Sequence, residues 1–321
     1  MLSTAMKLEQ NNTIHTSVMK TEVGEYLNPQ KNGTYVDATL GFGGHTLLIL
    51  EKTDYTAKVV CFEIDKDALS ITSEMLSNFS EKLTFVNKNF TELENVLNAL
   101  NLNEVNGVVA DLGLSSFQLE QSGKGFSFQK DEFLDMRADS TTDVTAFDLI
   151  NDLSSGQLSE IFWKYGEERF SRQIARAVTK SREEKEISTT LQLCSIVQSA
   201  IPGKFRPKKI NSSTKVFQAL RIAVNNELAN LELFLHKAIK CLAVGGRIVI
   251  ISFNSLEDKI VKNVFRQYST VCTCPPDLPI CRCGKEPVLK LINKRAMSPS
   301  NDEVSINPRS RSAKLRVAQK I

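Results

Sequence analysis

In the first third of the chain, short apolar runs typical of strands take turns with longer stretches typical of helices. Short runs rich in β-branched residues, typical of buried strands, occupy positions 34–40, 59–65, 83–90 and 107–114. Helix-length stretches such as 66–79 separate these runs. Strands that alternate with helices predict a parallel sheet, so this part of the chain is expected to form an α/β domain.

Three later segments extend the predicted sheet. Residues 246–253 include the unbroken apolar run from Ile248 to Ile251, which is typical of a strand buried on both faces. Residues 287–292 and 312–318 alternate apolar and polar positions, and they predict an antiparallel pair at one edge of the sheet.

About 130 residues separate the fourth and fifth predicted strands, many more than a single crossover helix requires. Apolar residues in this interval recur at helical spacing, as in Ile161, Phe162 and Tyr165. We therefore predict a helical subdomain inserted at 114–209, between two parts of a core domain at 1–113 and 210–321.

The segment 214–242 also has apolar residues at spacings of three and four, which predicts an amphipathic helix. Packing of its apolar face on the sheet is the favoured interpretation. A coiled-coil seam between two copies of the chain is the alternative, so a homodimer stays open.

Composition narrows the class of protein without naming a function. The 321 residues are 41% apolar and 24% charged, which is typical of a globular protein. No apolar run approaches the roughly 18 residues of a membrane span, and the N-terminus has neither a secretory nor an Arg-rich targeting pattern. A soluble, cytoplasmic protein without a membrane segment is expected.

The formal net charge is only +3, but basic residues are clustered along the chain. The three clusters are Arg169, Arg172, Arg176 and Lys180; Lys204, Arg206, Lys208 and Lys209; and Arg309, Arg311, Lys314 and Arg316. Any one of them could be a solvated face, whereas three together favour a nucleic-acid partner that contacts the chain through phosphates.

The first predicted strand runs into a turn, Gly41-Phe42-Gly43-Gly44, where the backbone can approach a ligand because no Cβ is in the way. Such turns serve nicotinamide, flavin, phosphate and adenosylmethionine sites alike. Asp37, just before this turn, would repel a pyrophosphate but would suit the ammonium group of S-adenosylmethionine. The turn therefore favours a methyl donor.

Two further residues extend this cofactor hypothesis. Asp65 ends the second predicted strand, about 20 residues after the turn, where an acid can accept the ribose hydroxyls. Glu63 competes for that role, and the position at the carboxyl end of the strand favours Asp65. Phe90, at the end of the third run, is placed to lie against an adenine ring.

Several longer sequence motifs follow one another along the chain. They are GFGGHT, DLGLSSFQL, KGFSF, LDMRAD, YGEERFSRQIARA, FQALRIAVNNEL and ISFNSLED. With them the chain closely resembles the RsmH (MraW) family of 16S rRNA cytosine-N4 methyltransferases, over residues 15–316. The resemblance departs from the usual family words at two positions, Asn254 in place of His and Lys124 in place of Arg.

The resemblance implies a Rossmann-like class I methyltransferase core with an inserted helical subdomain. It implies S-adenosylmethionine as the cofactor, and as substrate a cytidine near the decoding centre of 16S rRNA, free or within the small ribosomal subunit. The cofactor contacts of the family fall on Gly43, Gly44, His45, Asp65, Phe90, Asp111 and Gln118.

Methyl transfer from a sulfonium is an in-line displacement, so no covalent nucleophile is needed. The cytosine amino group is a poor nucleophile, and acceptors for its protons would make attack easier. Asp111 and Ser115, with Ser116 beside it, are the catalytic candidates. The alternative is that Asp111 only binds cofactor and the serines only cap a turn. Phe126 and Phe128 could clamp an extruded base or simply anchor a loop.

Four of the seven cysteines crowd into one short segment, as Cys272-x-Cys274 and Cys281-x-Cys283. Four thiolates could hold a structural zinc, but the spacing is not the usual one, and a reduced surface loop is the alternative. No metal ligand is assigned.

Three rival functions are weaker. A nicotinamide-dependent oxidoreductase would need a glycine at the sixth place of the turn, and GFGGHT has none. A DNA cytosine-N4 methyltransferase would usually carry a Pro-Pro-aromatic word where this chain has DLGLSS. A non-catalytic RNA-binding protein is disfavoured by the intact cofactor words.

Overall fold

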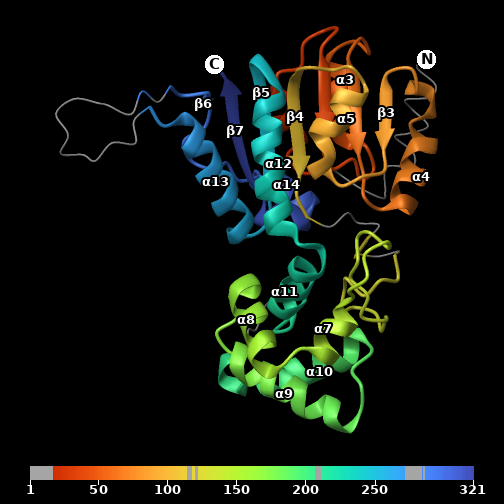
Figure 1. The fold of residues 1–321 in the computed structure, drawn as a ribbon, viewed down its shortest axis with the longest axis vertical. Coiled ribbons are helices and arrows are strands. Elements are labelled where there is room, and N and C mark those ends of the chain that lie inside the picture. Colours follow the sequence, from red (N-terminus) through yellow and green to blue (C-terminus); the bar gives the residue numbers. More distant parts are fainter. Residues whose placement is uncertain (1–16, 114–117, 120–121, 207–210, 272–283, 285) are drawn as a thin grey trace, which may run out of the picture. The chain divides into compact units, whose positions relative to one another are not determined.

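The computed structural model describes residues 17–113, 118–119, 122–206, 211–271, 284 and 286–321. The chain divides into two compact units (Figure 1). The core unit consists of Met1–Gly113 and Leu228–Ile321, and the helical unit consists of Leu114–Glu227.

A seven-stranded sheet forms the centre of the core unit, in the order β3-β2-β1-β4-β5-β7-β6 (Figure 1). The strands are β1 (Thr34–Asp37), β2 (Lys58–Phe62), β3 (Leu83–Val86), β4 (Val105–Asp111), β5 (Leu242–Ser252), β6 (Leu289–Leu291) and β7 (Lys314–Lys320). Strands β1 to β5 are parallel, and β7 is antiparallel to both β5 and β6. The predicted α/β fold with an antiparallel edge pair is confirmed.

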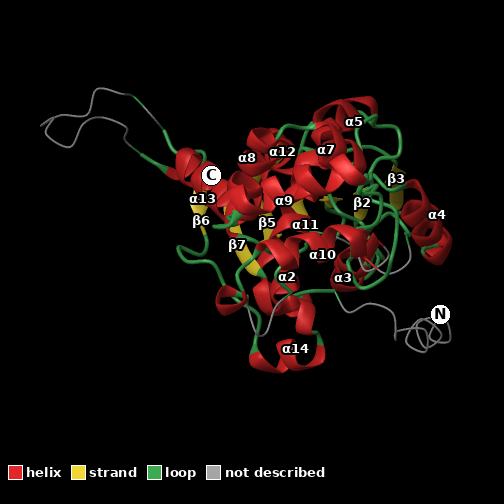
Figure 2. Cartoon of the chain, turned by 90° about the horizontal axis from the view of Figure 1, so that it is seen from below, coloured by secondary structure: helices red, strands yellow, loops and turns green. Residues whose placement is uncertain are grey.

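Helices cover both faces of this sheet because its strands are apolar on both sides. The helices of the core unit are α2 (Lys20–Leu27), α3 (Gly44–Lys52), α4 (Lys66–Met75), α5 (Leu93–Ala99), α12 (Glu227–Cys241), α13 (Ser255–Ser269) and α14 (Asn301–Ile306), with 3₁₀ turns at Ser77–Phe79, Phe90–Glu92 and Pro308–Ser312. Val36 and Val108 pack with α5, α12 and α13, and their neighbours Tyr35 and Val109 pack with α2 and α3. Figure 2 shows the strands between these two layers.

The strand order reverses between β1 and β4, because β2 and β3 lie on one side of β1 and β5 lies beyond β4. In open α/β sheets this switch point, at the carboxyl ends of the strands, is where ligands bind. Asp37 and Asp111 end the two strands that meet there. The topology therefore brings together the glycine turn after β1 and the start of the loop after β4.

The helical unit contains α7 (Ala146–Asp152), α8 (Ser155–Gly166), α9 (Ser171–Glu184), α10 (Thr190–Ala200) and α11 (Thr214–Asn225), with a 3₁₀ turn at Gly203–Phe205. Capping boxes fix the first residues of α7, α8 and α10, where Thr145, Ser154 and Thr189 each bond the third residue of their helix. Phe162 and Leu193 lie in a separate apolar core, which agrees with the predicted helical insertion.

The second end of the insertion differs from the prediction. The segment 214–242 forms two helices and part of β5 instead of one helix on the sheet, because Asn226 has a left-handed φ of 49° and ends α11. Leu220 is buried in the helical unit, and Leu235 is buried against the sheet. The insertion thus ends at Glu227 rather than at residue 209. Residues of its apolar face are thus divided between the two cores, as the packing interpretation requires for part of the segment.

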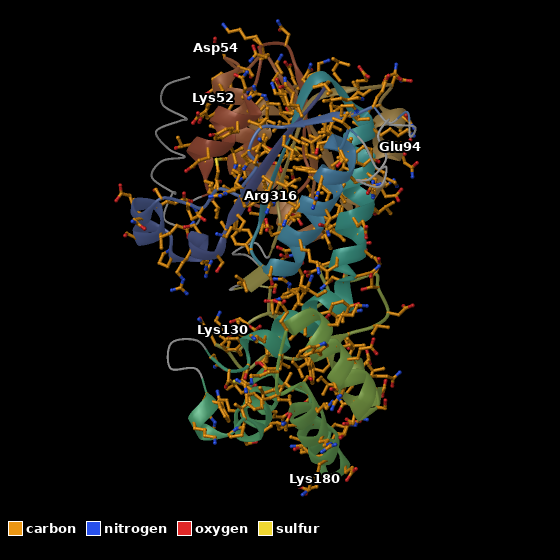
Figure 3. All side chains as sticks on the ribbon, turned by 90° about the vertical axis from the view of Figure 1, so that its left-hand side faces the viewer. Lys52, Asp54, Glu94, Lys130, Lys180 and Arg316 are labelled. Atoms are coloured by element: carbon orange, nitrogen blue, oxygen red, sulfur yellow. The ribbon has the colours of Figure 1, made fainter. Side chains whose placement is uncertain are left out.

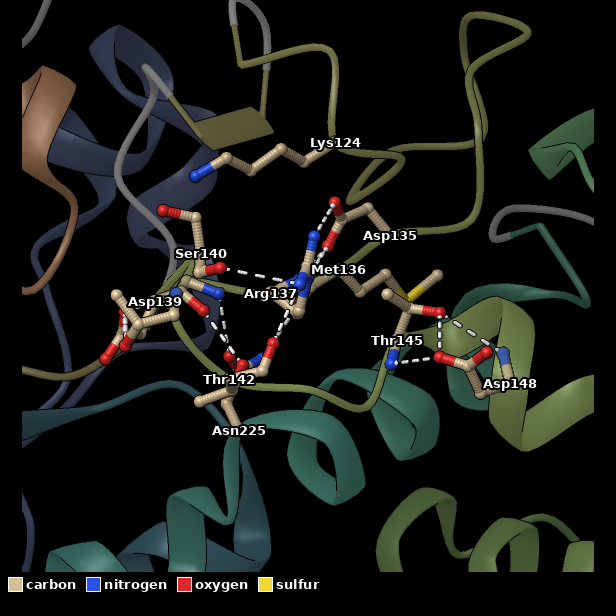
Figure 4. A network of polar contacts seen from close by, with 12 residues as sticks. Lys124, Asp135, Met136, Arg137, Asp139, Ser140, Thr142, Thr145, Asp148 and Asn225 are labelled. Carbon is tan, nitrogen blue, oxygen red and sulfur yellow. Dashed lines mark hydrogen bonds and ion pairs between the residues drawn. The ribbon is translucent and has the colours of Figure 1, made fainter.

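The irregular segment before α7 is held by the Arg137 side chain (Figure 4). The guanidinium donates to both oxygens of Asp135, at 2.7 and 3.0 Å, and to the Thr142 carbonyl at 2.7 Å. Asn225 donates to the carbonyl of Met136, a buried residue with a positive φ of 58°. The motif LDMRAD is therefore held by hydrogen bonds from Arg137 within the motif and from Asn225 outside it.

Within the described part of the chain, every helix is too short or too polar to span a lipid bilayer.

Candidate active site

The turn between β1 and α3 requires glycine at three places, for different reasons. Gly41 and Gly43 have φ values of 49° and 77°, which L side chains rarely adopt. A Cβ on Gly44 would lie 1.7 Å from the Ser17 hydroxyl oxygen, and a Cβ on Gly43 would lie 2.7 Å from Leu76. Around Gly41 no described atom lies within 4 Å of such a Cβ. The turn is thus packed behind Gly43 and Gly44 and open at Gly41.

Glu63 fixes the open end of this turn. Its carboxylate accepts the Gly41 amide at 3.0 Å with one oxygen and the Asp65 amide at 3.0 Å with the other. The Thr72 hydroxyl donates to the Gly41 carbonyl at 2.6 Å. Burial raises the pKa of Glu63 to about 7. Because both of its oxygens bond the backbone, Glu63 acts as a brace between the segments that follow β1 and β2.

Asp65 is the first residue outside α4, and it is only 1% exposed. One carboxylate oxygen accepts the amides of Asp67 and Ala68, at 3.0 and 3.3 Å. This capping orients the side chain at the carboxyl end of β2, the place expected for a ribose contact. The sequence prediction did not include the helix cap.

Asp37 has contacts that the sequence did not reveal. The side chain is 1% exposed, and its two oxygens accept the Thr46 hydroxyl at 2.7 Å and the Thr39 amide at 3.2 Å. Burial raises the pKa of this carboxyl. Asp37 thus ties β1 to α3 inside the core unit, and its contact with the ammonium group of a cofactor stays a prediction.

His45 and Asp111 form the least satisfied polar pair of the core unit. His45, in the first turn of α3, is 5% exposed, and its Nε2 lies 3.7 Å from the Asp111 Oδ2. Neither ring nitrogen of His45, nor the Oδ1 of Asp111, has a hydrogen-bond partner among the described residues. A buried polar atom left without a partner costs about 1–3 kcal/mol. These atoms therefore suit the polar groups of a bound molecule.

The Asp111 backbone is held firmly while its side chain is not. Its amide donates to the Thr39 hydroxyl at 2.7 Å, which ties the end of β4 to the loop after β1. Thr39 and Thr72 are the residues of the site that the sequence did not reveal, because a single hydroxyl carries no spacing signal.

Phe90 does not belong to a strand, in contrast to the prediction. β3 ends at Val86, and Phe90 begins a 3₁₀ turn capped by Asn89, whose side chain accepts the Thr91 amide at 2.9 Å. The Phe90 ring is partly buried, with its centroid 4.7 Å from that of Phe234 in α12. The ring is therefore fixed from one side, after the carboxyl end of β3.

Two predicted site residues are not among the described residues of the core unit. Ser115, like Ser116, lies outside the described residues. Gln118 belongs to the helical unit, where it is 8% exposed and its carbonyl accepts the Ser122 hydroxyl. The four clustered cysteines, Cys272, Cys274, Cys281 and Cys283, also lie outside the described residues.

The predicted aromatic clamp is internal to the helical unit. Phe126 is 6% exposed and belongs to its apolar core. The Phe128 ring packs edge-on against Phe217, with centroids 5.2 Å apart. The interpretation that these rings anchor a loop agrees with the structure.

The basic clusters have different surroundings. On α9, Arg172, Arg176 and Lys180 are exposed along one face, and Figure 3 shows the Lys180 side chain extending from the ribbon. In the third cluster, the Arg316 guanidinium instead forms a bidentate pair with Asp258, at 2.7 and 2.8 Å. The charge of Arg316 is therefore balanced by a carboxylate. Lys208 and Lys209 lie outside the described residues, and their contact with RNA stays a prediction.

Asn254, where the family usually has His, caps α13. Its side-chain oxygen accepts the amides of Leu256 and Glu257, both at 3.0 Å, and Glu257 accepts the Asn254 amide in return. The substitution is thus explained by a capping box at the carboxyl end of β5.

Comparison with known proteins identifies the family of the chain. The chain is 45% identical over 307 residues to "Ribosomal RNA small subunit methyltransferase H" of Geotalea uraniireducens, with 96% of this chain and 98% of that protein covered. The proteins of the same name from Carboxydothermus hydrogenoformans and Geobacter sulfurreducens are each 47% identical, over 96% of this chain and 98% and 99% of theirs. Residues 12–321 match the description "MraW methylase family". The chain belongs to the MraW methylase family.

Proposed function

We propose that the protein transfers a methyl group from S-adenosylmethionine to the exocyclic N4 of a cytidine in 16S ribosomal RNA, near the decoding centre. Family membership supports the reaction and the cofactor. The observation that carries the proposal to particular residues is the His45–Asp111 pair. Three of its polar atoms are buried without hydrogen-bond partners among the described residues, at the switch point of the sheet.

The residues present fit S-adenosylmethionine, whose sulfonium supplies an activated methyl group when it is bound. The opening at Gly41 allows close approach to the backbone, with Gly43 and Gly44 forming the floor of the turn. Asp65 is placed for the ribose hydroxyls and Phe90 for the adenine face. His45 and Asp111 offer polar atoms to the remaining groups, and we include Gln118 among the cofactor contacts on the family resemblance.

The chemistry assigned to the chain is alignment and proton acceptance. The Thr39 hydroxyl accepts the backbone amide of Asp111 and so fixes the end of β4, and we assign the Asp111 carboxylate, with Ser115, as acceptor for the protons of the target amino group. Acceptors there increase the electron density on N4 and so favour in-line attack. Since its substrate is ribosomal RNA, we place the protein in the cytoplasm.

The test is transfer of tritium from labelled S-adenosylmethionine to small ribosomal subunits and to free 16S RNA, followed by nucleoside analysis. Label in N4-methylcytidine is expected, and the better of the two substrates identifies the assembly stage. Label in another nucleoside would contradict the proposed specificity. RNA binding without transfer would favour a non-catalytic role, and equal transfer to DNA would favour the DNA-methyltransferase alternative.

A further inference from the structure

Two loops of the helical unit bring a cation and two aromatic rings together on the surface. Arg169 and Phe170 lie between α8 and α9, and Phe205 lies in the 3₁₀ turn after α10. The Arg169 guanidinium carbon lies 4.9 Å from the centroid of Phe170 and 5.0 Å from that of Phe205. The two ring centroids are 5.5 Å apart, and the Lys204 ammonium lies 4.9 Å from the centre of Phe205.

This cluster is exposed and carries uncompensated positive charge. Phe205 is 43% exposed, and Arg169 and Lys204 are exposed beside it. Within the described ranges, neither cation has a carboxylate within ion-pair distance. The nitrogens of Arg169 thus stay available to a ligand while its plane lies against the rings.

The loops that carry the cluster are held by hydrogen bonds within the helical unit. Glu168 is 5% exposed, and its carboxylate accepts the Phe170 amide at 2.8 Å. Lys215 donates to the Glu167 carbonyl at 2.8 Å, and Arg206 donates to the Ile201 carbonyl at 2.9 Å. The rings and the guanidinium are therefore held in place before any ligand arrives, which reduces the entropy lost on binding.

We propose that Arg169, Phe170, Lys204 and Phe205 form a stacking platform for an unpaired nucleotide of the RNA substrate, an inference that rests on the proposed function. Aromatic and guanidinium planes stack on bases, and ammonium groups contact phosphates. The exposed stripe Arg172, Arg176 and Lys180 begins three residues after Arg169 on α9, and it continues the platform as a track for the phosphate backbone.

The platform favours single-stranded RNA over a duplex. A base paired and stacked within an A-form helix offers its phosphates to lysine and arginine but not its face to a phenylalanine. Loss of the ring should therefore weaken binding to an unpaired strand and leave the weaker, charge-driven binding to a duplex unchanged. An acidic protein partner would depend on the cations and not on the ring.

The experiment compares Phe205→Leu with Phe133→Leu in the full-length protein. Phe133 is 49% exposed in the same unit and also lies beside another phenylalanine, at 5.3 Å, but no cation is stacked on it in the described structure. Anisotropy would measure the Kd for a short single-stranded RNA and for a duplex of equal length. A second variant, Arg169→Lys, keeps the charge and removes the guanidinium plane.

We expect Phe205→Leu to weaken single-strand binding about tenfold and Arg169→Lys to weaken it less, with duplex binding and S-adenosylmethionine affinity unchanged. Phe133→Leu should bind like the parent protein. If Phe205→Leu loses equal affinity for the single strand and for the duplex, the platform is overturned, and the surface only contacts phosphates. If Phe205→Leu leaves RNA binding unchanged and lowers only the Tm, the platform is overturned, and Arg169 serves only to shield the rings from water.

The outcomes separate this inference from the proposed function. Methylation of ribosomal RNA with an unaltered KM and unaltered strand binding in Phe205→Leu would remove the platform and leave the function standing. Ring-dependent binding by a parent protein that transfers no methyl group would do the reverse.

Discussion

The two units differ in where their polar side chains lie and in the hydrogen bonds that these side chains form. In the core unit, His45 and Asp111 are packed inside with three polar atoms that lack hydrogen-bond partners among the described residues. In the helical unit, the Arg137 guanidinium is bonded to Asp135 and to two backbone carbonyls. The cations of that unit without carboxylate partners, such as Arg169 and Arg172, lie on its surface instead.

The difference reflects the ligands that each unit is proposed to bind. A small cofactor is surrounded by protein, so its contacts must be buried, and until it binds they have a desolvation cost. An RNA strand stays mostly in solvent and is held by exposed cations and ring faces. Variants that separate stability from binding should therefore behave in opposite ways in the two units.

The largest effect is expected for Asp111→Asn, which keeps the size of the side chain but removes its charge. Loss of a preorganised acceptor should reduce kcat by about 100-fold or more. The free energy of unfolding should change little, because among the described residues the ion-pair partner of the Asp111 carboxylate is His45, at 3.7 Å. Single-turnover transfer and urea denaturation measure the two quantities.

Asp258→Asn is the matched control for Asp111, since this carboxylate in the same unit is satisfied by Arg316. It should lose stability and keep its activity per folded molecule. An Asp111→Asn protein with full kcat but weakened S-adenosylmethionine binding would assign Asp111 to the cofactor alone.

Asp65→Ala should weaken S-adenosylmethionine binding by more than a factor of about ten, because a charge-assisted ribose contact contributes about 1.5–3 kcal/mol. The variant also loses the cap of α4, at a cost of about 1 kcal/mol in stability. Ser154→Ala, which removes a cap from α8 in the helical unit, controls for that cost. Calorimetry showing unchanged affinity would return the ribose role to Glu63 or contradict the cofactor site.

The exposed stripe of the helical unit is tested by Arg172→Glu combined with Arg176→Glu. Because these residues are proposed to contact phosphates, KM for ribosomal substrate should rise about tenfold at low salt and the difference should shrink as salt increases. Cofactor affinity should stay unchanged. Lys262→Glu with Arg266→Glu makes the same charge change on an exposed face of α13 in the core unit. Equal KM values for the two double variants at every salt concentration would argue against the stripe.

Much of the core unit could be predicted from sequence because its signals are local. Unbroken apolar runs marked β2 and β5, and the glycine turn marked the start of α3. The split between α11 and α12 was missed because apolar spacing continues through it, and only the left-handed Asn226 divides the segment. The bond between Asp37 and the hydroxyl of Thr46 was missed because an acid at a strand end has the same sequence signal whether it faces a ligand, a hydroxyl or both.

Glu63 gives the core unit a pH dependence. Burial raises its pKa to about 7, so between about pH 4.5 and pH 7 the folded chain holds a proton that the unfolded chain releases. The free energy of unfolding should fall across that window as pH rises, by about 1–2 kcal/mol after allowance for partial exposure. Denaturant titrations at pH 5 and pH 8 should show a smaller fall in Glu63→Gln. An equal fall in both proteins would mean that another group is responsible.

The smallest effect is expected for Asn254, which sits at the end of β5 in the core unit. Asn254→Ala removes both capping bonds of α13, so it should lower the free energy of unfolding by about 1 kcal/mol, whereas Asn254→Asp should keep the cap. Methyl transfer by the folded protein should be unchanged in both, because the described contacts of the side chain are with its own helix. Asn254→His restores the usual family residue but lacks the short acceptor of a good cap. If that variant transfers methyl groups faster despite its lower stability, residue 254 takes part in the ligand-binding site of the core unit and does not only cap a helix.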